Sequence, residues 1–506
     1  MRFPEYEAYD AVGLAKLIRK GEISSAEVLE AAIERIELLN PAVNAIAYKM
    51  YDQARAQLND LDQTAPFAGV PFLLKDLSLS YANVPTSSGS LWLKDYTRPY
   101  HSELVQRYLN AGLVIVGKTT TPEFGLQPIT ESKLFGVTRN PWDLDRSAGG
   151  SSGGAAAAVS IQMVPMAQGG DGAGSIRIPA SNCAVFGFKP TRGRTPTGPD
   201  IGRIWQGLVV EHALSKTVRD NAALLDVTQG NDVGNPMYLE NPAQSYVEQL
   251  KTPVRSLKIA LIKAPFFKAT VSPDCIAAVE HSAKLCANLG HQVEEVVFPV
   301  NSDALLRAML ILMSADLNMM FKHVSPRRPH GKNTEINNKL LAKLGNYYTA
   351  TEFSEALFLF DLYTRKMGEL FTKYDIVLTP TVAQPPMKIG ALQLTWLENL
   401  GAHLLDLMGT RGMLKTASLK NTAKIFALMP YTAMFNITGQ PAMSVPLFWN
   451  RQNLPIGSQF VARFADDCLL FQLAHQLEQA QPWQQRLPPI LDQVEIASTH
   501  VITSSI

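Results

Sequence analysis

The sequence predicts an α/β fold, because helical and strand patterns alternate along the chain. Residues 257–262, 273–289 and 292–298 read as strand, helix and strand, the order of a parallel β-α-β unit. A further buried strand, YDIVLT, is predicted at 374–379. The apolar block at 155–167 suits a buried helix followed by a buried strand. With 506 residues, 46% of them hydrophobic, the chain can bury a sizeable core, and we expect one large domain.

The N-terminal part is predicted to form amphipathic helices that pack on the outside of this domain. Ser24 and Glu27 have the spacing of a capping box, and apolar residues follow them at helical intervals. The pair Asn40-Pro41 is expected to end that helix, because proline has no N–H to donate.

The composition narrows the class of partner. A formal net charge of +1, without long basic clusters, gives no field that would attract nucleic acid or anionic lipid. The N-terminus lacks a secretory pattern, and the best apolar run, at 304–321, is interrupted by Arg307 and Asp316. The four cysteines are too few and too scattered for a disulfide framework or a zinc site. We therefore expect a cytoplasmic protein that takes a small neutral molecule and binds neither nucleic acid nor a membrane.

The segment at 149–180, GGSSGGAAAAVSIQMVPMAQGGDGAGSIRIPA, is the most informative part of the chain. Such a density of glycine marks backbone that bends sharply or approaches a ligand closely, and it holds Ser151 and Ser175. A flexible linker would be polar throughout, whereas an apolar block separates the two glycine clusters here. A phosphate-binding loop would need Gly-Lys-Ser/Thr or GxGxxG, and neither spacing occurs in this segment.

This segment resembles the signature of the amidase signature family, which hydrolyses or transfers carboxamides with a Ser-Ser-Lys triad. The likeness comprises GGSSGG at 149–154, an acidic residue at Asp171 and GSIRIPA at 174–180. Upstream, GVPFLLKD resembles the family's lysine segment and places the lysine at Lys75. The segments GKTTTPEFG, FGFKPTRGR and FNITGQPAMSVPL extend the likeness over most of the chain.

The resemblance implies the amidase signature fold, a central mixed β-sheet flanked on both faces by α-helices. Within a single domain over 1–506, we expect N-terminal helices at 1–64, a catalytic core at 65–200 and a helical substrate-pocket region at 303–428. Neither a cofactor nor a metal is implied.

The resemblance also assigns roles to the two motif serines and the lysine. Ser175 is the nucleophile; the alternative is a serine that caps the following helix. Lys75 is the base, which requires burial or a nearby positive charge to lower its pKa until it is neutral. Ser151 is the relay that passes the proton between them. The neighbouring Ser152 either orients this relay or satisfies a turn.

Small residues precede the nucleophile, and charged residues flank it. Gly172, Ala173, Gly174 and Ser175 itself can direct consecutive backbone N–H groups at one oxygen, which predicts the oxyanion hole. For Asp171 and Arg177, which flank the nucleophile, the resemblance implies structural charges that fix the loop through hydrogen bonds.

Other catalytic arrangements find less support in the sequence. There is no Gly-x-Ser-x-Gly elbow for a Ser/His/Asp triad, and the nine histidines form no HExxH or comparable metal cluster. His101, His212, His281 and His291 are expected at element ends or in ordinary helices. Cys183 is expected to be a core residue.

The substrate and two rival functions remain open at the level of sequence. Gly172-Ala173-Gly174-Ser175 stands where most relatives have Thr-Gly-Gly-Ser, and this resembles the subgroup of cyclic-dimer hydrolases that act on 6-aminohexanoate oligomers. One rival is a glutamyl/aspartyl-tRNA amidotransferase A-like subunit, which would need partner subunits and a basic surface. The other is an inactive binding relative, which the intact motif disfavours. A monomer and a homodimer both fit.

The pocket itself is predicted from the helical region. Apolar, Met-rich helices at 304–320 and 403–414 are expected to line its mouth and to favour neutral, apolar acyl chains. For Met309, Met313, Met319 and Met320 the alternative is plain core filling.

Overall fold

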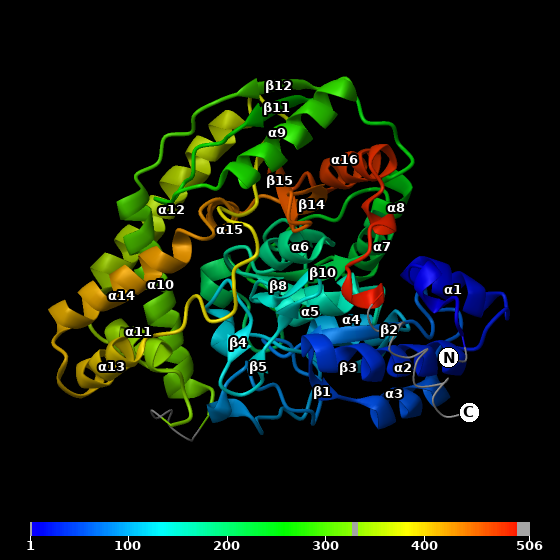
Figure 1. Cartoon of the computed structure of the whole chain (residues 1–506), viewed down its shortest axis with the longest axis horizontal. Coiled ribbons are helices and arrows are strands. Elements are labelled where there is room, and N and C mark those ends of the chain that lie inside the picture. Colours follow the sequence, from blue (N-terminus) through cyan, green and yellow to red (C-terminus); the bar gives the residue numbers. More distant parts are fainter. Residues whose placement is uncertain (1–2, 326–331, 493–506) are drawn as a thin grey trace.

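The computed structural model describes residues 3–325 and 332–492, and its centre is one 11-stranded mixed β-sheet with helices on both faces (Figure 1). The strand order is β1-β3-β2-β8-β10-β9-β14-β15-β13-β11-β12. The strands are β1 Ile46–Lys49, β2 Pro71–Lys75, β3 Val114–Thr119, β8 Met166–Asp171, β9 Phe186–Lys189, β10 Val210–Ser215, β11 Lys258–Leu261, β12 Gln292–Glu295, β13 Ile376–Pro380, β14 Ala442–Trp449 and β15 Pro455–Ala462. Two small two-stranded sheets are formed by β4 Glu131–Ser132 with β5 Gly136–Val137, and by β6 Arg139–Asn140 with β7 Asp143–Ser147.

The sheet combines parallel and antiparallel strand pairs. β2 pairs in parallel with β3 and β8, and β11 pairs in parallel with β12 and β13. Between these two parallel parts, β8, β10, β9, β14, β15 and β13 follow one another as antiparallel neighbours. The predicted β-α-β unit is therefore confirmed, and so is the mixed sheet that the family resemblance implied.

The helices complete the layers. They are α1 Ala11–Arg19, α2 Ser25–Val43, α3 Tyr51–Gln57, α4 Glu103–Asn110, α5 Gly153–Ser160, α6 Arg177–Cys183, α7 Val218–Thr228, α8 Tyr246–Gln249, α9 Pro273–Asn288, α10 Ser302–His323, α11 Ile336–Gly345, α12 Ala350–Leu370, α13 Trp396–Met408, α14 Arg411–Phe426, α15 Ala433–Ile437 and α16 Asp467–Ala480.

Strand β2 shows how the two faces are filled. Phe72 and Leu74 join the core that contains α4 and α7, while Leu73 joins the core that contains α5 and α6. Because side chains alternate along a strand, Lys75 at the end of β2 points to the same face as Leu73. The strand therefore directs the lysine toward the glycine-rich segment that leads into α5.

Three details differ from the sequence prediction. Helix α2 has the predicted capping box but continues past Pro41 to Val43. Pro41 lies in the last turn, where its missing N–H costs one bond, and the helix is closed instead by Asn44, whose N–H donates to Asn40 O at 2.8 Å. The N-terminal region also contains a strand, β1. The strand predicted at 292–298 ends earlier, at Glu295.

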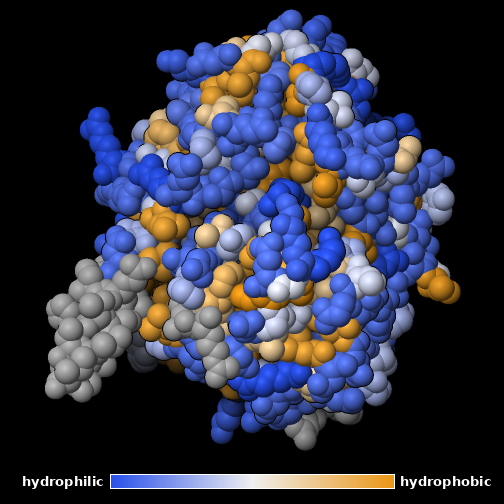
Figure 2. Space-filling model, turned by 90° about the vertical axis from the view of Figure 1, so that its right-hand side faces the viewer, coloured by the Kyte–Doolittle hydropathy of each residue, from blue (hydrophilic) through white to orange (hydrophobic). Residues whose placement is uncertain are grey.

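The helices predicted within 303–428 are present as α10 to α14, with β13 between α12 and α13. α10 contacts α11, α12 and α14, and it is the one helix in the described residues whose length and composition would suit a membrane crossing. Half of its apolar window is buried inside the protein. Figure 1 places α13 and α14 at the outer edge of the molecule. The right-hand side of Figure 1, seen in Figure 2, is covered mostly by hydrophilic residues.

Candidate active site

One cavity of about 240 Å³ brings together the three residues that the sequence singled out. Lys75 reaches it from the end of β2, Ser151 from the turn before α5, and Ser175 from the turn between β8 and α6. Lys75 and Ser151 are each 1% exposed, so bulk water has little access to either group. Ser175 is not the N-cap of α6, because that position is Ile176 and it makes no side-chain cap.

A direct hydrogen bond joins the lysine and the first serine. Lys75 Nζ lies 2.7 Å from Ser151 Oγ, and 3.4 Å from the carbonyl oxygen of Gly170. The backbone N–H of Lys75 donates to Gln168 Oε1 at 2.8 Å, which fixes the end of β2 against β8. The lysine side chain is therefore held toward Ser151 by contacts at both of its ends.

The protonation of Lys75 is governed by burial and by two carboxylates. Burial lowers the pKa of Lys75 below its ordinary value, while the charges of Glu211 and Asp171 oppose that shift. Burial raises the pKa of Glu211, which Lys75 in turn opposes. The sequence predicted an apolar setting for the lysine and missed Glu211. A single acidic residue in the strand pattern VVEHALS gives no local signal of what it faces.

Ser152 and the glycines hold the two serine turns together. The Ser152 N–H donates to Ser175 O at 3.1 Å, and Ser152 Oγ donates to Gly170 O at 3.3 Å. A Cβ atom on Gly150 would lie 2.5 Å from Ile129 O, so this position excludes a side chain. The Gly150–Ser151 peptide bond is cis. These contacts favour the turn-forming role of Ser152.

The turn before α6 is built around the Asp171 carboxylate. The N–H of Gly174 donates to Asp171 Oδ1 at 2.7 Å, and that of Ile176 to Oδ2 at 3.2 Å. Gly174 has φ 123°, and a Cβ there would lie 2.3 Å from Thr432 Oγ1, so only glycine fits. Because the Gly174 N–H is engaged by Asp171, the predicted oxyanion donors that remain are the N–H groups of the neighbouring residues.

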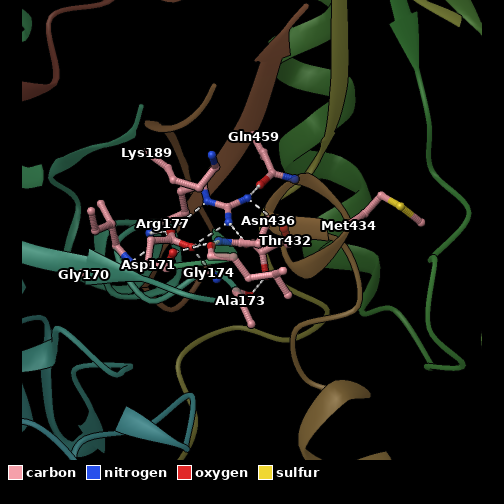
Figure 3. A network of polar contacts seen from close by, with 12 residues as sticks. Gly170, Asp171, Ala173, Gly174, Arg177, Lys189, Thr432, Met434, Asn436 and Gln459 are labelled. Atoms are coloured by element: carbon pink, nitrogen blue, oxygen red, sulfur yellow. Dashed lines mark hydrogen bonds and ion pairs between the residues drawn. The ribbon is translucent and has the colours of Figure 1, made fainter. Parts of the chain in front are cut away.

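Figure 3 shows the buried network that anchors this turn. Arg177 Nε donates to Asp171 Oδ2 at 2.9 Å and Nη2 to Oδ1 at 2.8 Å, with both side chains fully buried. The remaining guanidinium donors reach Thr432 O at 3.0 Å, Gln459 Oε1 at 2.5 Å and Asn436 Oδ1 at 2.6 Å. Burial alone would raise the pKa of Asp171, but Arg177 keeps it well below its usual value. These contacts connect the turn to α15 and its N-cap Thr432 and to β15.

The opposite wall of the cavity comes from α10 and the end of α14. Met313, Met319 and Met320 line it, whereas Met309 is completely buried in the core. Residues 403–414, expected at the mouth, do not line this cavity; Phe426 and Met429 occupy that place. They were misplaced because an amphipathic pattern shows that a helix has an apolar face but does not show what the face covers.

The wall is not uniformly apolar, because Asp316 and Arg203 also line the cavity. Burial raises the pKa of Asp316 to about 6, although a backbone N–H from Trp205 partly stabilises the carboxylate. The sequence treated Asp316 only as an interruption of an apolar run.

Within the part of the chain that the structure describes, neither a histidine nor a cysteine lines the cavity. His212 was expected at an element end or in a helix, but it lies inside β10 and contacts Asn221 Oδ1 at 2.7 Å. Burial lowers the pKa of His212 to about 4. Cys183 is fully buried, as predicted, and donates to Ala148 O. In the described ranges 3–325 and 332–492, no group of three or more His, Cys, Asp or Glu could hold a metal ion.

The chain is similar to known amidases over nearly its whole length. The Amidase family model matches residues 27–471. Two 6-aminohexanoate-cyclic-dimer hydrolases, from Pseudomonas sp. (strain NK87) and Paenarthrobacter ureafaciens, are 35% and 36% identical; each alignment covers 96% of this chain and 97% of the relative. A solved structure of 6-aminohexanoate cyclic dimer hydrolase with substrate superimposes with a TM-score of 0.86 at 33% identity, covering 96% of this chain and 99% of that one.

The fold, the family model and the relatives together define a hydrolase that cleaves amides. The chain belongs to the Amidase family, since the model and both relatives span nearly its whole length. It is an amidohydrolase that acts on amides, and it is similar to the 6-aminohexanoate-cyclic-dimer hydrolases.

Proposed function

We propose that this protein hydrolyses a small, non-peptide carboxamide through a Ser-Ser-Lys triad and an acyl-enzyme on Ser175. The observation that carries the proposal is the 2.7 Å hydrogen bond between Lys75 Nζ and Ser151 Oγ, in a cavity that Ser175 also lines. A neutral lysine bonded to a serine hydroxyl can accept a proton through it, and the lowered pKa of Lys75 supports the neutral form.

In the first half of the reaction the proton moves away from the nucleophile. Ser175 Oγ attacks the carbonyl carbon of the amide while its proton passes to Ser151 Oγ, and the proton of Ser151 passes to Lys75 Nζ. The carbonyl π electrons move to oxygen, where backbone N–H groups stabilise the negative charge. In the described residues the N–H groups of Ala173 and Ser175 have no acceptor within the protein, so both are available for this role.

In the second half the proton returns. The C–N bond breaks as Ser151 gives its proton to the departing nitrogen, and the Lys75 ammonium restores the proton to Ser151. Water then attacks the acyl-enzyme by the same route and releases the acid. Ser152, Asp171 and Arg177 act by holding the turns in place, since each is bonded to the backbone of a serine turn or to its anchor.

The substrate class that fits best is a cyclic or linear amide of the 6-aminohexanoate type. The two relatives are named for hydrolysis of the cyclic dimer, and the methionine-lined wall suits a flexible aliphatic chain. We further propose that a single domain over 1–506 acts in the cytoplasm without a cofactor and without a different partner subunit, as a monomer or homodimer.

A panel of linear and cyclic amides, given to the purified protein alone, tests this proposal. We expect hydrolysis of at least one neutral aliphatic or aryl amide, and a mass increase on Ser175 when turnover is quenched. Activity on glutamine alone, or only after addition of other subunits, would favour the amidotransferase A-like subunit. A protein that binds amides and forms no adduct on any serine would be an inactive binding relative.

A further inference from the structure

Glu211 is a buried carboxylate of the cavity that the proposed mechanism does not use. It is 1% exposed and lies in β10, directly opposite Gly170 of β8. A Cβ atom on Gly170 would lie 2.5 Å from Glu211 Oε2, so this glycine leaves the space that the carboxylate occupies. The carbonyl oxygen of the same Gly170 lies 3.4 Å from Lys75 Nζ. Glu211 and the lysine thus pack against the same residue.

A glutamine fixes the direction of the Glu211 carboxylate. Gln168 Nε2 donates to Glu211 Oε2 at 2.7 Å, while Gln168 Oε1 accepts the backbone N–H of Lys75 at 2.8 Å. The amide therefore ties the carboxylate to the strand that carries the lysine. The groups that face Glu211 are Lys75 and Ser78 from β2 and its end, Gln168 and Asp171 from β8, and Tyr108 from α4.

Among these groups Lys75 is the only one that can carry a positive charge. Asp171 repels the Glu211 carboxylate and already has Arg177 as its own counter-ion. A buried carboxylate without a counter-ion is unfavourable, so Glu211 is best compensated whenever Lys75 is an ammonium. In the proposed mechanism that state exists between attack by Ser175 and departure of the amine.

We propose that Glu211 is a positioning residue that stabilises the Lys75 ammonium formed when Ser175 attacks the amide. The proton moves as described above, from Ser175 to Ser151 and from Ser151 to Lys75, and Glu211 neither gains nor loses one. This inference rests on the proposed function, because it needs Lys75 to accept the proton. It assigns to Glu211 the task that the aspartate performs beside the histidine of a Ser-His-Asp triad.

Removal of the negative charge has two consequences that a structural role does not share. The ammonium that forms during attack loses its stabilising charge, so the maximal rate falls. In the resting enzyme the Lys75 ammonium is also no longer stabilised by the carboxylate, so Lys75 becomes neutral at a lower pH. The acidic limb of the rate profile therefore moves to lower pH.

The test is the pH profile of kcat/KM for Glu211→Gln, which keeps the shape and an acceptor for Gln168. We expect a plateau about tenfold to a hundredfold lower and an acidic limb lower by about one pH unit, which corresponds to a tenfold change in the lysine equilibrium. The rate of fluorophosphonate labelling of Ser175 should follow the same limb. Glu211→Asp, which retains the charge, should keep the limb close to its wild-type position.

Glu123→Gln is the matched control. Glu123 is also buried, 2% exposed, and accepts from Ser90 Oγ and Asn338 Nδ2, but it does not line the cavity. The acidic limb of the Glu123→Gln profile should stay at the wild-type pH. If the acidic limb of Glu211→Gln also stays at the wild-type pH, or moves to higher pH, the role proposed for Glu211 is wrong, while the proposed triad is unaffected. Wild-type protein that forms no adduct on Ser175 overturns the triad itself, so the two failures are distinguishable.

Discussion

The serine side of the cavity and the helical region from α10 to α14, here called the helical side, are built in different ways; of these helices, α10 and the end of α14 reach the cavity. On the serine side, every residue of α5 and α6 is buried, and the charged pair Asp171–Arg177 is completely enclosed. On the helical side, α13 exposes large apolar residues; Trp396 is 76% and Leu407 is 78% exposed. A buried, fully bonded frame tolerates few changes, whereas loosely covered helices tolerate many. We therefore expect the proposed chemistry to depend on the serine side and the choice of substrate to depend on the helices.

The largest effect should come from the serine side. Ser175→Ala should abolish fluorophosphonate labelling and lower kcat by about 10⁴-fold or more, because the nucleophile is lost. Intact-mass spectrometry and a steady-state assay on the same sample measure both. Ser151→Ala should retain partial labelling, since the nucleophile stays in place. Full labelling of Ser175→Ala, or an adduct on Ser152, would contradict the assignment.

Lys75 should control how activity depends on pH. Only the neutral amine can accept a proton, and burial lowers its pKa, so activity should be low in acid, rise through that lowered pKa and stay level in mild alkali. Lys75→Ala should lose about 10²- to 10⁴-fold at every pH in that range. Profiles of kcat/KM against pH for the wild-type protein and Lys75→Ala test whether Lys75 is the base. A variant with wild-type kcat/KM throughout would identify another base.

A matched pair of arginine substitutions compares the two sides directly. Arg177→Met leaves the buried Asp171 without its counter-ion and should lower the free energy of unfolding by about 3–5 kcal/mol. Arg411→Met removes an exposed ion pair with Glu352 in the helical region and should cost about 1 kcal/mol or less. Urea titration followed by circular dichroism measures both. Equal losses would contradict the contrast between the two sides.

The smallest effect should come from the cavity wall. Met320→Ala removes apolar contact from the wall and should raise KM for an aliphatic amide about five- to tenfold, with little change in kcat. Met408→Ala is the control, because Met408 is 74% exposed on α13 and does not line the cavity. A similar KM for both variants would remove α10 from the substrate site.

The sequence predicted more about the serine side of the cavity than about the helical side. Ser151, Ser175 and Lys75 were singled out because GGSSGG, GSIRIPA and GVPFLLKD resemble the motifs of the amidase signature family, and the structure brings all three residues to one cavity. Glu211 could not be predicted, since its role depends on the pairing of β10 with β8, which joins residues 43 positions apart through Gln168.

On the helical side, the periodic pattern of apolar residues predicted the helices but not what their apolar faces contact. Met309, Met313 and Met320 share one helix, yet the first is core and the others face the cavity. The helical pattern does not show which part of the apolar face meets other helices and which part meets a cavity. The prediction that residues 403–414 line the mouth of the cavity was wrong for the same reason. Periodicity shows that a helix has an apolar face, whereas what this face contacts depends on tertiary packing.

The Arg177 network also has a consequence for how the enzyme is made on the ribosome. Two acceptors of the buried guanidinium, Thr432 O and Gln459 Oε1, lie 255 and 282 residues further along the chain. While the chain is being translated, the serine turn therefore has its own residues but not the groups that enclose its anchor. We therefore expect the turn that carries Ser175, the proposed nucleophile, to reach its final geometry only when nearly the whole polypeptide has emerged, and an unfinished chain to be inactive.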